Sequence, residues 1–300
     1  MADILVIGSL NMDMTVYVPR FPRVGETITG RDLLTAAGGK GSNQALAASR
    51  LGADVAMAGC GGNDMYGDAL IRGMQEGHVD VRHIRKTAKA ATGLAVITVC
   101  EGANNIVVAP GANMCLTEAD IDALEGEIAA AKALILQLEI PLVCVQRAID
   151  IARKHETKVF LNPAPYQEIP ESMYGAADYF IPNETEAMAL LGWNKLVDVE
   201  GALRALKEKG VKNPIITLGD KGAAYLHAGR FHHDPCCRVT PVDSTAAGDT
   251  FIGALARCIL AGDELPEAVQ FAQRASAYCV THKGAHTSIP TLDDVNAMQC

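Results

Sequence analysis

Residues 243–254 combine a carboxylate with a row of very small side chains in front of a predicted helix. Asp249 follows the small residues 245–248, and from Thr250 the apolar residues recur at helical spacing. Such a helix start presents unpaired backbone N–H groups, and the positive end of the helix dipole favours an anion such as a phosphoryl group. Asp249 could then take a proton from a hydroxyl that attacks the bound phosphorus. Taken alone, the stretch fits a simple Asp helix cap better, so the other motifs must decide.

Two polar side chains follow the first predicted strand, residues 3–7. Asn11 and Asp13 lie two positions apart, so in an extended segment they point to the same side. A carboxylate and an amide side by side can bind the hydroxyls of a vicinal diol. An Asx turn after the strand explains the same two residues equally well.

Residues 38–44, Gly-Gly-Lys-Gly-Ser-Asn-Gln, precede a predicted helix at 45–51 that is rich in small residues. The glycines permit close approach of the backbone to a ligand, which Asn43 is placed to hydrogen-bond. The P-loop of NTPases is excluded, because it needs Gly-Lys-Ser/Thr and here Gly41 follows Lys40. Packing of the helix against strands explains its alanines but not three glycines in four residues, and Lys40 would then be a solvated charge.

Three more polar residues, Glu139, Asn162 and Asn183, each end or follow an apolar run. Ligands bind beyond the carboxyl ends of parallel strands, so each is a candidate by position. Asn183 and Glu186 have the spacing of a capping box, and Glu186 could equally help to hold a hydrated Mg²⁺. Residues 214–222 are typical of a strand and a glycine-containing turn, which either lines a nucleotide or is a plain β-turn.

The rest of the chain alternates predicted strands and helices, which indicates an α/β fold with a mostly parallel, doubly wound sheet. The predicted strands cover residues 55–58, 133–138, 159–162, 179–182, 214–217 and 223–226. The predicted helices cover residues 65–76, 119–130, 142–153, 250–260 and 267–280.

Two strand-like regions, at 14–34 and 94–108, fall outside this alternation and are predicted to pair into a small sheet that covers the site. Their apolar residues on both faces predict that one face packs against a partner chain. We therefore expect a single domain over residues 1–300 with a discontinuous β lid from about 13–37 and 93–109. The lid sheets are expected to form a homodimer.

The composition sets further limits. With 300 residues, 49% of them apolar, the chain can form one large α/β core. Its net charge of −9 argues against nucleic acid as a partner. No run approaches the roughly 20 apolar residues that cross a bilayer, and no cleavage signal precedes the first strand. Nine scattered cysteines suit a reducing compartment, so we expect no disulfide framework and a cytoplasmic protein. Residues 232–237, His-His-Asp-Pro-Cys-Cys, suit a loop better than a zinc site.

Together these motifs resemble, in the right order, those of the ribokinase-like carbohydrate kinase family. Residues 8–13, 38–43 and 243–254 carry the resemblance, and residues 183–186 match the family's Asn-x-x-Glu element. Gln137-Leu138-Glu139 and Asn162-Pro-Ala-Pro165 fit as well, and the resemblance extends over essentially the whole chain. It implies the ribokinase-like fold and ATP-dependent phosphorylation of the 5-hydroxyl of ribose.

The resemblance also implies residue roles. Asp249 would be the catalytic base, with the amides of Ala246, Ala247 and Gly248 as the anion hole. The residues implied around the sugar are Asn11, Asp13, Gly39, Lys40, Gly41, Asn43, Glu139 and Asp249. Those implied along the nucleotide are Asn183, Thr217, Leu218, Gly219, Asp220, Lys221, Gly222, Gly248 and Gln273.

Two cations are implied by the same resemblance. Mg²⁺ would accompany ATP near Glu186, through water, and an activating K⁺ would bind near Asp243, Thr245, Cys279, His282, Gly284 and Ser288. Cys279 and His282 are unusual there, but main-chain carbonyls contribute at those places. The Ala246-Ala247 pair departs from a glycine-containing version common in the family, which costs little where the φ angles stay negative. We also expect the helix start to lower the pKa of Asp249.

Other functions fit the sequence less well. Asn11 beside Asp13 favours ribose over 2-deoxyribose, a ketohexose or a nucleoside as the substrate. A non-catalytic sugar or nucleotide sensor would not need Asp249 and its small-residue loop. A nicotinamide-dependent enzyme is disfavoured, because residues 8–13 lack the glycines of a dinucleotide fingerprint.

Overall fold

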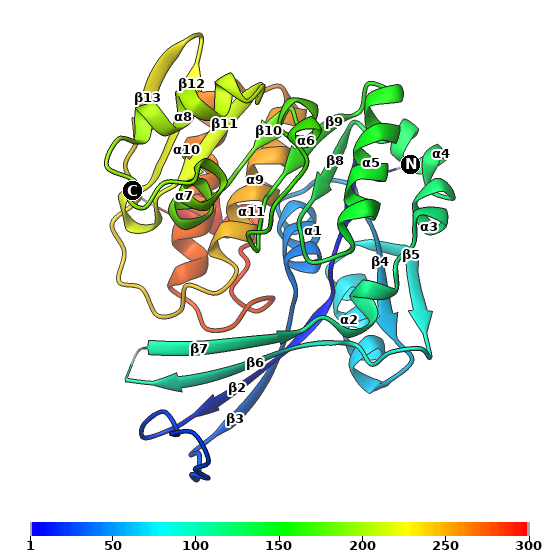
Figure 1. The fold of residues 1–300 in the computed structure, drawn as a ribbon, viewed down its shortest axis with the longest axis vertical. Helices are drawn as coiled ribbons and strands as arrows, with labels where there is room; N and C mark the ends of the chain where they lie inside the picture. The colour runs from blue at the N-terminus through cyan, green and yellow to red at the C-terminus, as the bar shows by residue number, and fades with distance from the viewer. Residues whose placement is uncertain (1, 102, 299–300) are drawn as a thin grey trace.

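A nine-stranded sheet forms the centre of the protein in this computed structural model, which describes residues 2–101 and 103–298 (Figure 1). Its strands, from one edge to the other, are β13 (Arg230–Asp234), β12 (Ala223–His227), β11 (Asn213–Thr217), β10 (Tyr179–Phe180), β9 (Lys158–Leu161), β8 (Ala133–Leu136), β1 (Ile4–Ile7), β4 (Val55–Gly62) and β5 (Asp80–Thr87). All pair in parallel except β12 and β13, which are antiparallel at one edge.

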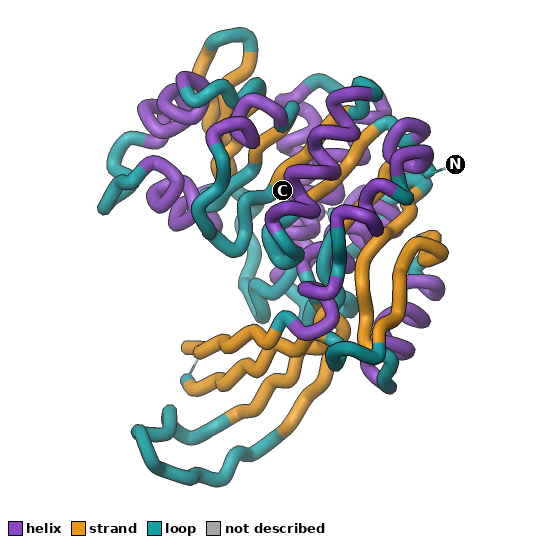
Figure 2. The backbone as a smooth tube through the Cα atoms, turned by 45° about the vertical axis from the view of Figure 1, so that its right-hand side comes forward, coloured by secondary structure: helices purple, strands orange, loops and turns teal. Residues whose placement is uncertain are grey.

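Helices cover both faces of this sheet (Figure 2). One face carries α1 (Lys40–Arg50), α2 (Met65–Glu76), α9 (Ala247–Ala261), α10 (Leu265–Val280) and α11 (Leu292–Ala297). The other carries α3 (Glu118–Asp122), α4 (Glu125–Ala130), α5 (Leu142–Lys154), α6 (Glu171–Ala176), α7 (Glu184–Leu191) and α8 (Val199–Glu208). Strand β1 divides its side chains between the two cores, Ile4 and Val6 in one and Leu5 and Ile7 in the other. Its continuous apolar run is therefore that of a strand buried on both faces.

A second sheet of four strands, which we call the lid, projects from the body at the bottom of Figure 1. Its order is β3 (Leu33–Gly38), β2 (Asn11–Tyr17), β6 (Gly93–Cys100) and β7 (Ala103–Ala109). Strand β2 pairs in parallel with β6, and the two outer pairs are antiparallel. The pairing of the two strand-like regions is thus confirmed.

Two predicted elements are wrong in detail. The strand expected up to residue 34 begins only at Leu33, because pairing with β2, rather than local β propensity, determines where it forms. The helix expected at 119–130 is divided into α3 and α4. The turn between them, at Leu124, keeps Ile121 and Ile128 both fully buried.

Two further features of the chain concern membrane-spanning helices and cysteine residues. No helix in the described part of the chain is long and apolar enough to cross a bilayer. Among the residues that the structure describes, seven cysteines have free thiols, namely Cys60, Cys100, Cys115, Cys144, Cys236, Cys258 and Cys279. Cys300 lies outside the described residues.

Candidate active site

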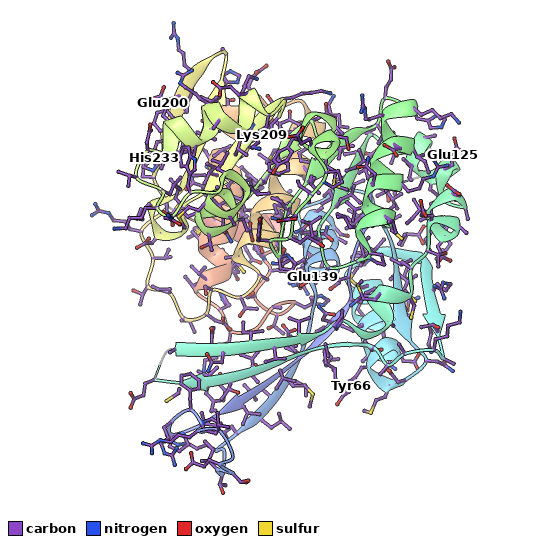
Figure 3. The ribbon with its side chains drawn as sticks, viewed as in Figure 1. Tyr66, Glu125, Glu139, Glu200, Lys209 and His233 are labelled. Atoms are coloured by element: carbon purple, nitrogen blue, oxygen red, sulfur yellow. The ribbon has the colours of Figure 1, made fainter. Side chains whose placement is uncertain are left out.

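The carboxyl edge of the main sheet and the lid enclose a pocket of about 710 Å³. Figure 3 shows Glu139 at this place, between the body and the lid. Seven of the predicted sugar-binding residues line the pocket: Asn11, Asp13, Gly39, Lys40, Asn43, Glu139 and Asp249. Gly41 lies behind it, where its N–H donates to Ser9 Oγ at 3.3 Å.

A smaller pocket of about 220 Å³ adjoins the first. It is lined by residues predicted for the nucleotide and its cation, among them Asn183, Glu186, Thr217 and Gly248. The two pockets share a set of lining residues: Lys40, Ser244, Ala246 and Asp249. Asp249 therefore stands where the pockets meet.

The carboxylate of Asp249 is held by two consecutive residues of α1. Its Oδ2 accepts a hydrogen bond from Asn43 Nδ2 and its Oδ1 one from Gln44 Nε2, both at 2.8 Å. The helix-cap interpretation is wrong, because α9 begins at Ala247 with Ala246 as its N-cap residue and no side chain caps it. Asp249 is 8% exposed and faces the ligand pockets.

The expectation of a lowered pKa for Asp249 is also wrong. Burial raises its pKa above the usual value and outweighs the lowering by Lys40 and by the bonds from Asn43 and Gln44. A base with a raised pKa accepts a proton more readily near neutral pH. Burial lowers the pKa of Lys40, but the carboxylates of Asp249 and Glu139 outweigh that effect and raise it, so Lys40 stays cationic.

The start of α9 provides backbone N–H donors at the place where the two pockets meet. Within the described residues, no protein acceptor meets the N–H groups of Gly248 and Asp249. The N–H of Ala247 was predicted as part of the anion hole, but it already donates a hydrogen bond to Ser244 O at 3.3 Å. Ala246 has a φ of 62°, in the left-handed region, so the condition under which the alanine pair costs little is not met at this residue. Glycine avoids the steric cost that alanine carries there.

The part of the larger pocket that holds the predicted sugar-binding residues is strongly acidic. Glu139 Oε2 accepts hydrogen bonds from Ser9 Oγ at 2.5 Å and from the Lys40 N–H at 3.1 Å. Burial, followed by repulsion from Glu139 and Asp249, raises the pKa of Asp13 to about 7. Asp13 can therefore exchange a proton near neutral pH. It can accept hydrogen bonds from hydroxyls, and in its protonated form it can also donate one to them.

The predicted nucleotide residues divide into two groups. Asn183 forms a β-bridge with Thr217 and a capping box with Glu186, whose Oε2 accepts from the Asn183 N–H at 2.8 Å. The capping-box interpretation is thus confirmed, and Glu186 also lines the smaller pocket, with its pKa raised by burial. The second group follows Thr217 in the chain or lies behind the turn that comes after it, and it lines neither pocket. Its members are Leu218, Gly219, Asp220, Lys221, Gly222 and Gln273.

Residues predicted for K⁺ meet beside the start of α9. Asp243 Oδ1 accepts from Thr245 N and Thr245 Oγ1, and Asp243 Oδ2 accepts from Gly284 N at 2.9 Å. Burial would raise the pKa of Asp243, but these bonds lower it, so the carboxylate stays ionised. Cys279 Sγ lies 3.1 Å from Ser288 Oγ. The side chain of His282 is the exception, because it is exposed and stacks on Tyr278.

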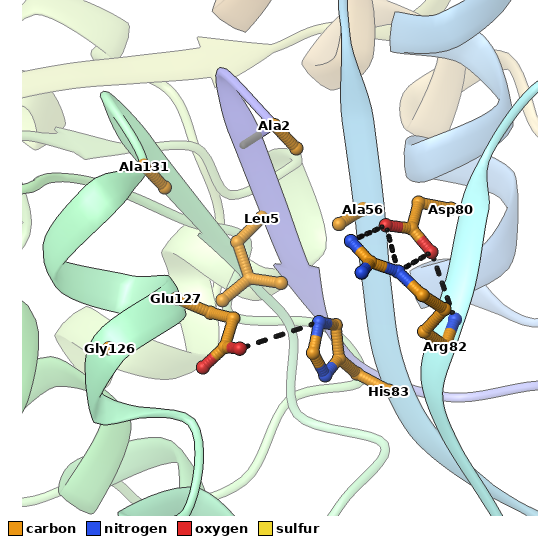
Figure 4. A pocket seen from close by; sticks show the side chains of 9 residues that line it. All are labelled: Ala2, Leu5, Ala56, Asp80, Arg82, His83, Gly126, Glu127 and Ala131. Carbon is orange, nitrogen blue, oxygen red and sulfur yellow. Dashed lines mark hydrogen bonds and ion pairs between the residues drawn. The ribbon is translucent and has the colours of Figure 1, made fainter.

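Another cavity, of about 270 Å³, opens at the opposite end of the strands (Figure 4). The alanines and Leu5 line it, together with two pairs of polar side chains. Arg82 pairs with Asp80 at 2.6 Å, and His83 lies 3.8 Å from Glu127. The cavity holds none of the predicted site residues, so the candidate active site is the place around Asp249 where the other two pockets meet.

Comparison with known proteins supports this conclusion. The model of the pfkB family carbohydrate kinases matches residues 1–292. The chain belongs to this family. It is similar to the ribokinase of Haemophilus influenzae, at 41% identity over 96% of this chain and 95% of that protein. It is 35% identical to the deoxyribokinase of Salmonella typhi, over 98% and 97% of the two chains. The solved structure of Arabidopsis thaliana ribokinase complexed with ribose and ATP matches with a TM-score of 0.90, at 30% identity over 98% and 97% of the chains.

Two residues that the sequence motifs did not indicate bond directly to candidate site residues of the kinase. Gln44 bonds Asp249 and also donates to Asn162 Oδ1 at 3.2 Å, while its own Oε1 accepts from Gln137 Nε2 at 2.7 Å. Asn113 is fully buried and bonds Asn11. Gln44 ends the glycine motif, but its position there does not reveal its bond to Asp249, and Asn113 lies in a short 3-10 helix without any local signal.

The left-handed conformation of Ala246 leads to a stability prediction. We expect Ala246→Gly to stabilise the kinase by about 0.5–1 kcal/mol, because glycine relieves the steric cost of φ 62°. The neighbouring Ala247→Gly is the matched control, and it should destabilise by about the same amount, since that residue is helical. Urea unfolding midpoints measure both. Equal destabilisation by the two changes would contradict the assigned strain.

The raised pKa of Asp13 leads to a pH-dependent prediction. Its pKa is about 7 in the folded kinase, against 3.8 for an unperturbed aspartate. The folded state therefore retains the proton between these values, and stability falls as pH rises through about 7. At pH 8, Asp13→Asn should thus raise the free energy of unfolding by roughly 1–3 kcal/mol relative to wild type, which a thermal melt shows as a higher Tm. The gain should shrink toward pH 5. A gain of the same size at both pH values, or one shared by the exposed control Asp54→Asn, would count against this origin.

Proposed function

We propose that this carbohydrate kinase transfers the γ-phosphoryl group of ATP to the 5-hydroxyl of D-ribose. The observation that carries the proposal is the position of Asp249, whose carboxylate lies where the sugar-sized pocket meets the smaller polar pocket. The similarity to ribokinases of several organisms supports ribose as the sugar.

The site geometry suits phosphoryl transfer in which the protein mainly positions groups and neutralises charge. Asp249 takes the proton of the attacking hydroxyl, and its raised pKa suits that task. The free N–H groups at the start of α9 and the cation of Lys40 stabilise the charge on the transferred group. Asn43 and Gln44 keep the carboxylate oriented.

Asn11 and Asp13 support ribose over 2-deoxyribose. They occupy alternate positions of β2 and line the same pocket, where they can hydrogen-bond adjacent hydroxyls. A sugar that lacks one hydroxyl leaves a buried partner unpaired, at a cost of about 1–3 kcal/mol. The deoxyribokinase of Salmonella typhi makes 2-deoxyribose the second candidate.

The residues present fit the two expected cations. Glu186 would hold Mg²⁺ through water in the smaller pocket, where the ion would neutralise phosphate charge. The ionised Asp243, with Thr245 and Ser288, would hold K⁺ beside the start of α9 by hard oxygen donors. Main-chain carbonyls would complete that set at Cys279, His282 and Gly284.

We further propose that the chain forms one domain with its lid, and that two copies pair through their lids in the cytoplasm. Val96 and Val107 lie opposite each other in β6 and β7 and are 44% and 69% exposed. They alternate with Ile97 and Ile106, which line the pocket, so they lie on the outer face of the lid. An apolar sheet face of this kind favours a partner surface. The free thiols suit a reducing compartment.

The test of the proposed reaction is ATP consumption with a panel of pentoses, hexoses and nucleosides, in the presence of Mg²⁺ and with or without K⁺. We expect ribose to give the highest kcat/KM, with 2-deoxyribose at least about tenfold lower.

In Asp249→Asn we expect kcat to fall by roughly 10² to 10⁴ with little change in KM, because the base is lost while the pockets remain. Turnover by that variant near the wild-type rate would refute the role of Asp249, and no turnover with any sugar would refute the function.

The proposed dimer has a matched pair of variants. Val107→Glu should convert the dimer into a monomer, because it puts a charge into the apolar lid interface. Val197→Glu is the control, since Val197 is 86% exposed on the body rather than the lid. Light scattering coupled to size-exclusion chromatography gives the mass of each. A monomeric wild type would contradict the proposal.

A further inference from the structure

Asn113, in the 3-10 helix η1 (Gly111–Cys115) after the last lid strand, has a side-chain amide whose orientation is fixed. Its Oδ1 accepts from the backbone N–H of Leu10 at 2.9 Å, and its Nδ2 donates to the carbonyl of Leu10 at 3.2 Å. A backbone N–H only donates and a backbone carbonyl only accepts. The two contacts therefore determine which end of the buried amide is oxygen and which is nitrogen.

This polarity passes to Asn11 in the sugar site. Asn113 Nδ2 also donates to Asn11 Oδ1 at 2.7 Å, so the oxygen of Asn11 is turned away and occupied. Asn11 Nδ2 then faces Glu139 Oε2 at 3.4 Å. Asn11 can offer the pocket only N–H donors, next to a carboxylate that only accepts.

The local packing preserves this arrangement at the base of the lid. Gly93 is the first residue of β6, and a methyl group there would lie 2.1 Å from Asn11 Oδ1 and 2.4 Å from Asn113 Nδ2. Both contacts are far inside van der Waals distance, so the amide pair fits only because this position has no side chain. Asn11 and Asn113 are 3% and 0% exposed, so water does not compete for their hydrogen bonds.

We propose that Asn113 is a positioning residue that sets the polarity of the sugar site by keeping Asn11 a hydrogen-bond donor beside the acceptor Glu139. The inference rests on the proposed sugar kinase function. A hydroxyl can accept from Asn11 and donate to a carboxylate at the same time, and a vicinal diol uses this alternation. A reversed Asn11 amide would place its oxygen against Glu139 Oε2 and leave the hydroxyls without a donor.

A double-mutant cycle tests the proposal, with ribose affinity measured by isothermal titration calorimetry. Asn113→Ala should weaken ribose binding about tenfold, by freeing the Asn11 amide. In an Asn11→Ala background the same change should weaken it less than about twofold, because Asn113 acts through Asn11. KM for ATP should stay within about twofold in Asn113→Ala, and the exposed control Asn194→Ala should bind ribose like wild type.

Additive losses in the cycle, or equal losses for ribose and ATP, would show that Asn113 has only a structural role and overturn the proposal. Asn113→Ser, which is too short to bridge Leu10 and Asn11, replaces the alanine variant if that one does not fold. A wild type that fails to bind ribose overturns the proposed substrate instead. The cycle is then run with the panel sugar that binds, so the role of Asn113 is still decided.

Discussion

The site depends on one packing constraint, the close contact between helices α1 and α9. Asp249 in α9 and its partners Asn43 and Gln44 in α1 are more than 200 residues apart in the chain, yet they share a buried hydrogen-bonded cluster. Gly253 permits the contact, since a methyl group there would lie 2.7 Å from Gln44 O and 2.8 Å from Ala47 Cβ. A glycine inside a helix costs up to about 1 kcal/mol, which the buried contact must offset.

Helix α1 therefore contributes to the larger pocket and holds the Asp249 carboxylate at the same time. Gly39 has a φ of 99°, and a side chain there would meet the backbone of Leu10 and Asn11. Gly41 packs as closely against Gly8 and Ser9. These contacts attach the start of α1 to the strand that leads into the lid, so α1 connects the residues of the larger pocket with the Asp249 carboxylate. Preorganisation of this kind holds reacting groups in the geometry that a reaction needs.

The sequence was sufficient for the architecture and for residues that lie within motifs. Alternating apolar runs indicated the parallel sheet, since strands such as β1 are buried on both faces. Short-range spacing also indicated Asn11 with Asp13, and the capping box at Asn183. It could not indicate Gln44 or Asn113, whose roles come from partners 205 and 102 residues away. Nor could it give the pKa of Asp249, because the dipole argument is local whereas burial depends on the whole fold.

The side chains that line the two pockets are mostly negative, and this affects the charge that a ligand can carry into them. Among the described lining residues, Lys40 is the only cationic side chain and faces the carboxylates of Asp13, Glu139, Glu186 and Asp249. A triphosphate entering such a place meets net repulsion, which the backbone donors of α9 offset only in part. The proposed Mg²⁺ would reduce this repulsion for the nucleotide that it accompanies. The raised pKa of Asp13, about 7, weakens this repulsion in part, because below that pH a proton held there removes one negative charge.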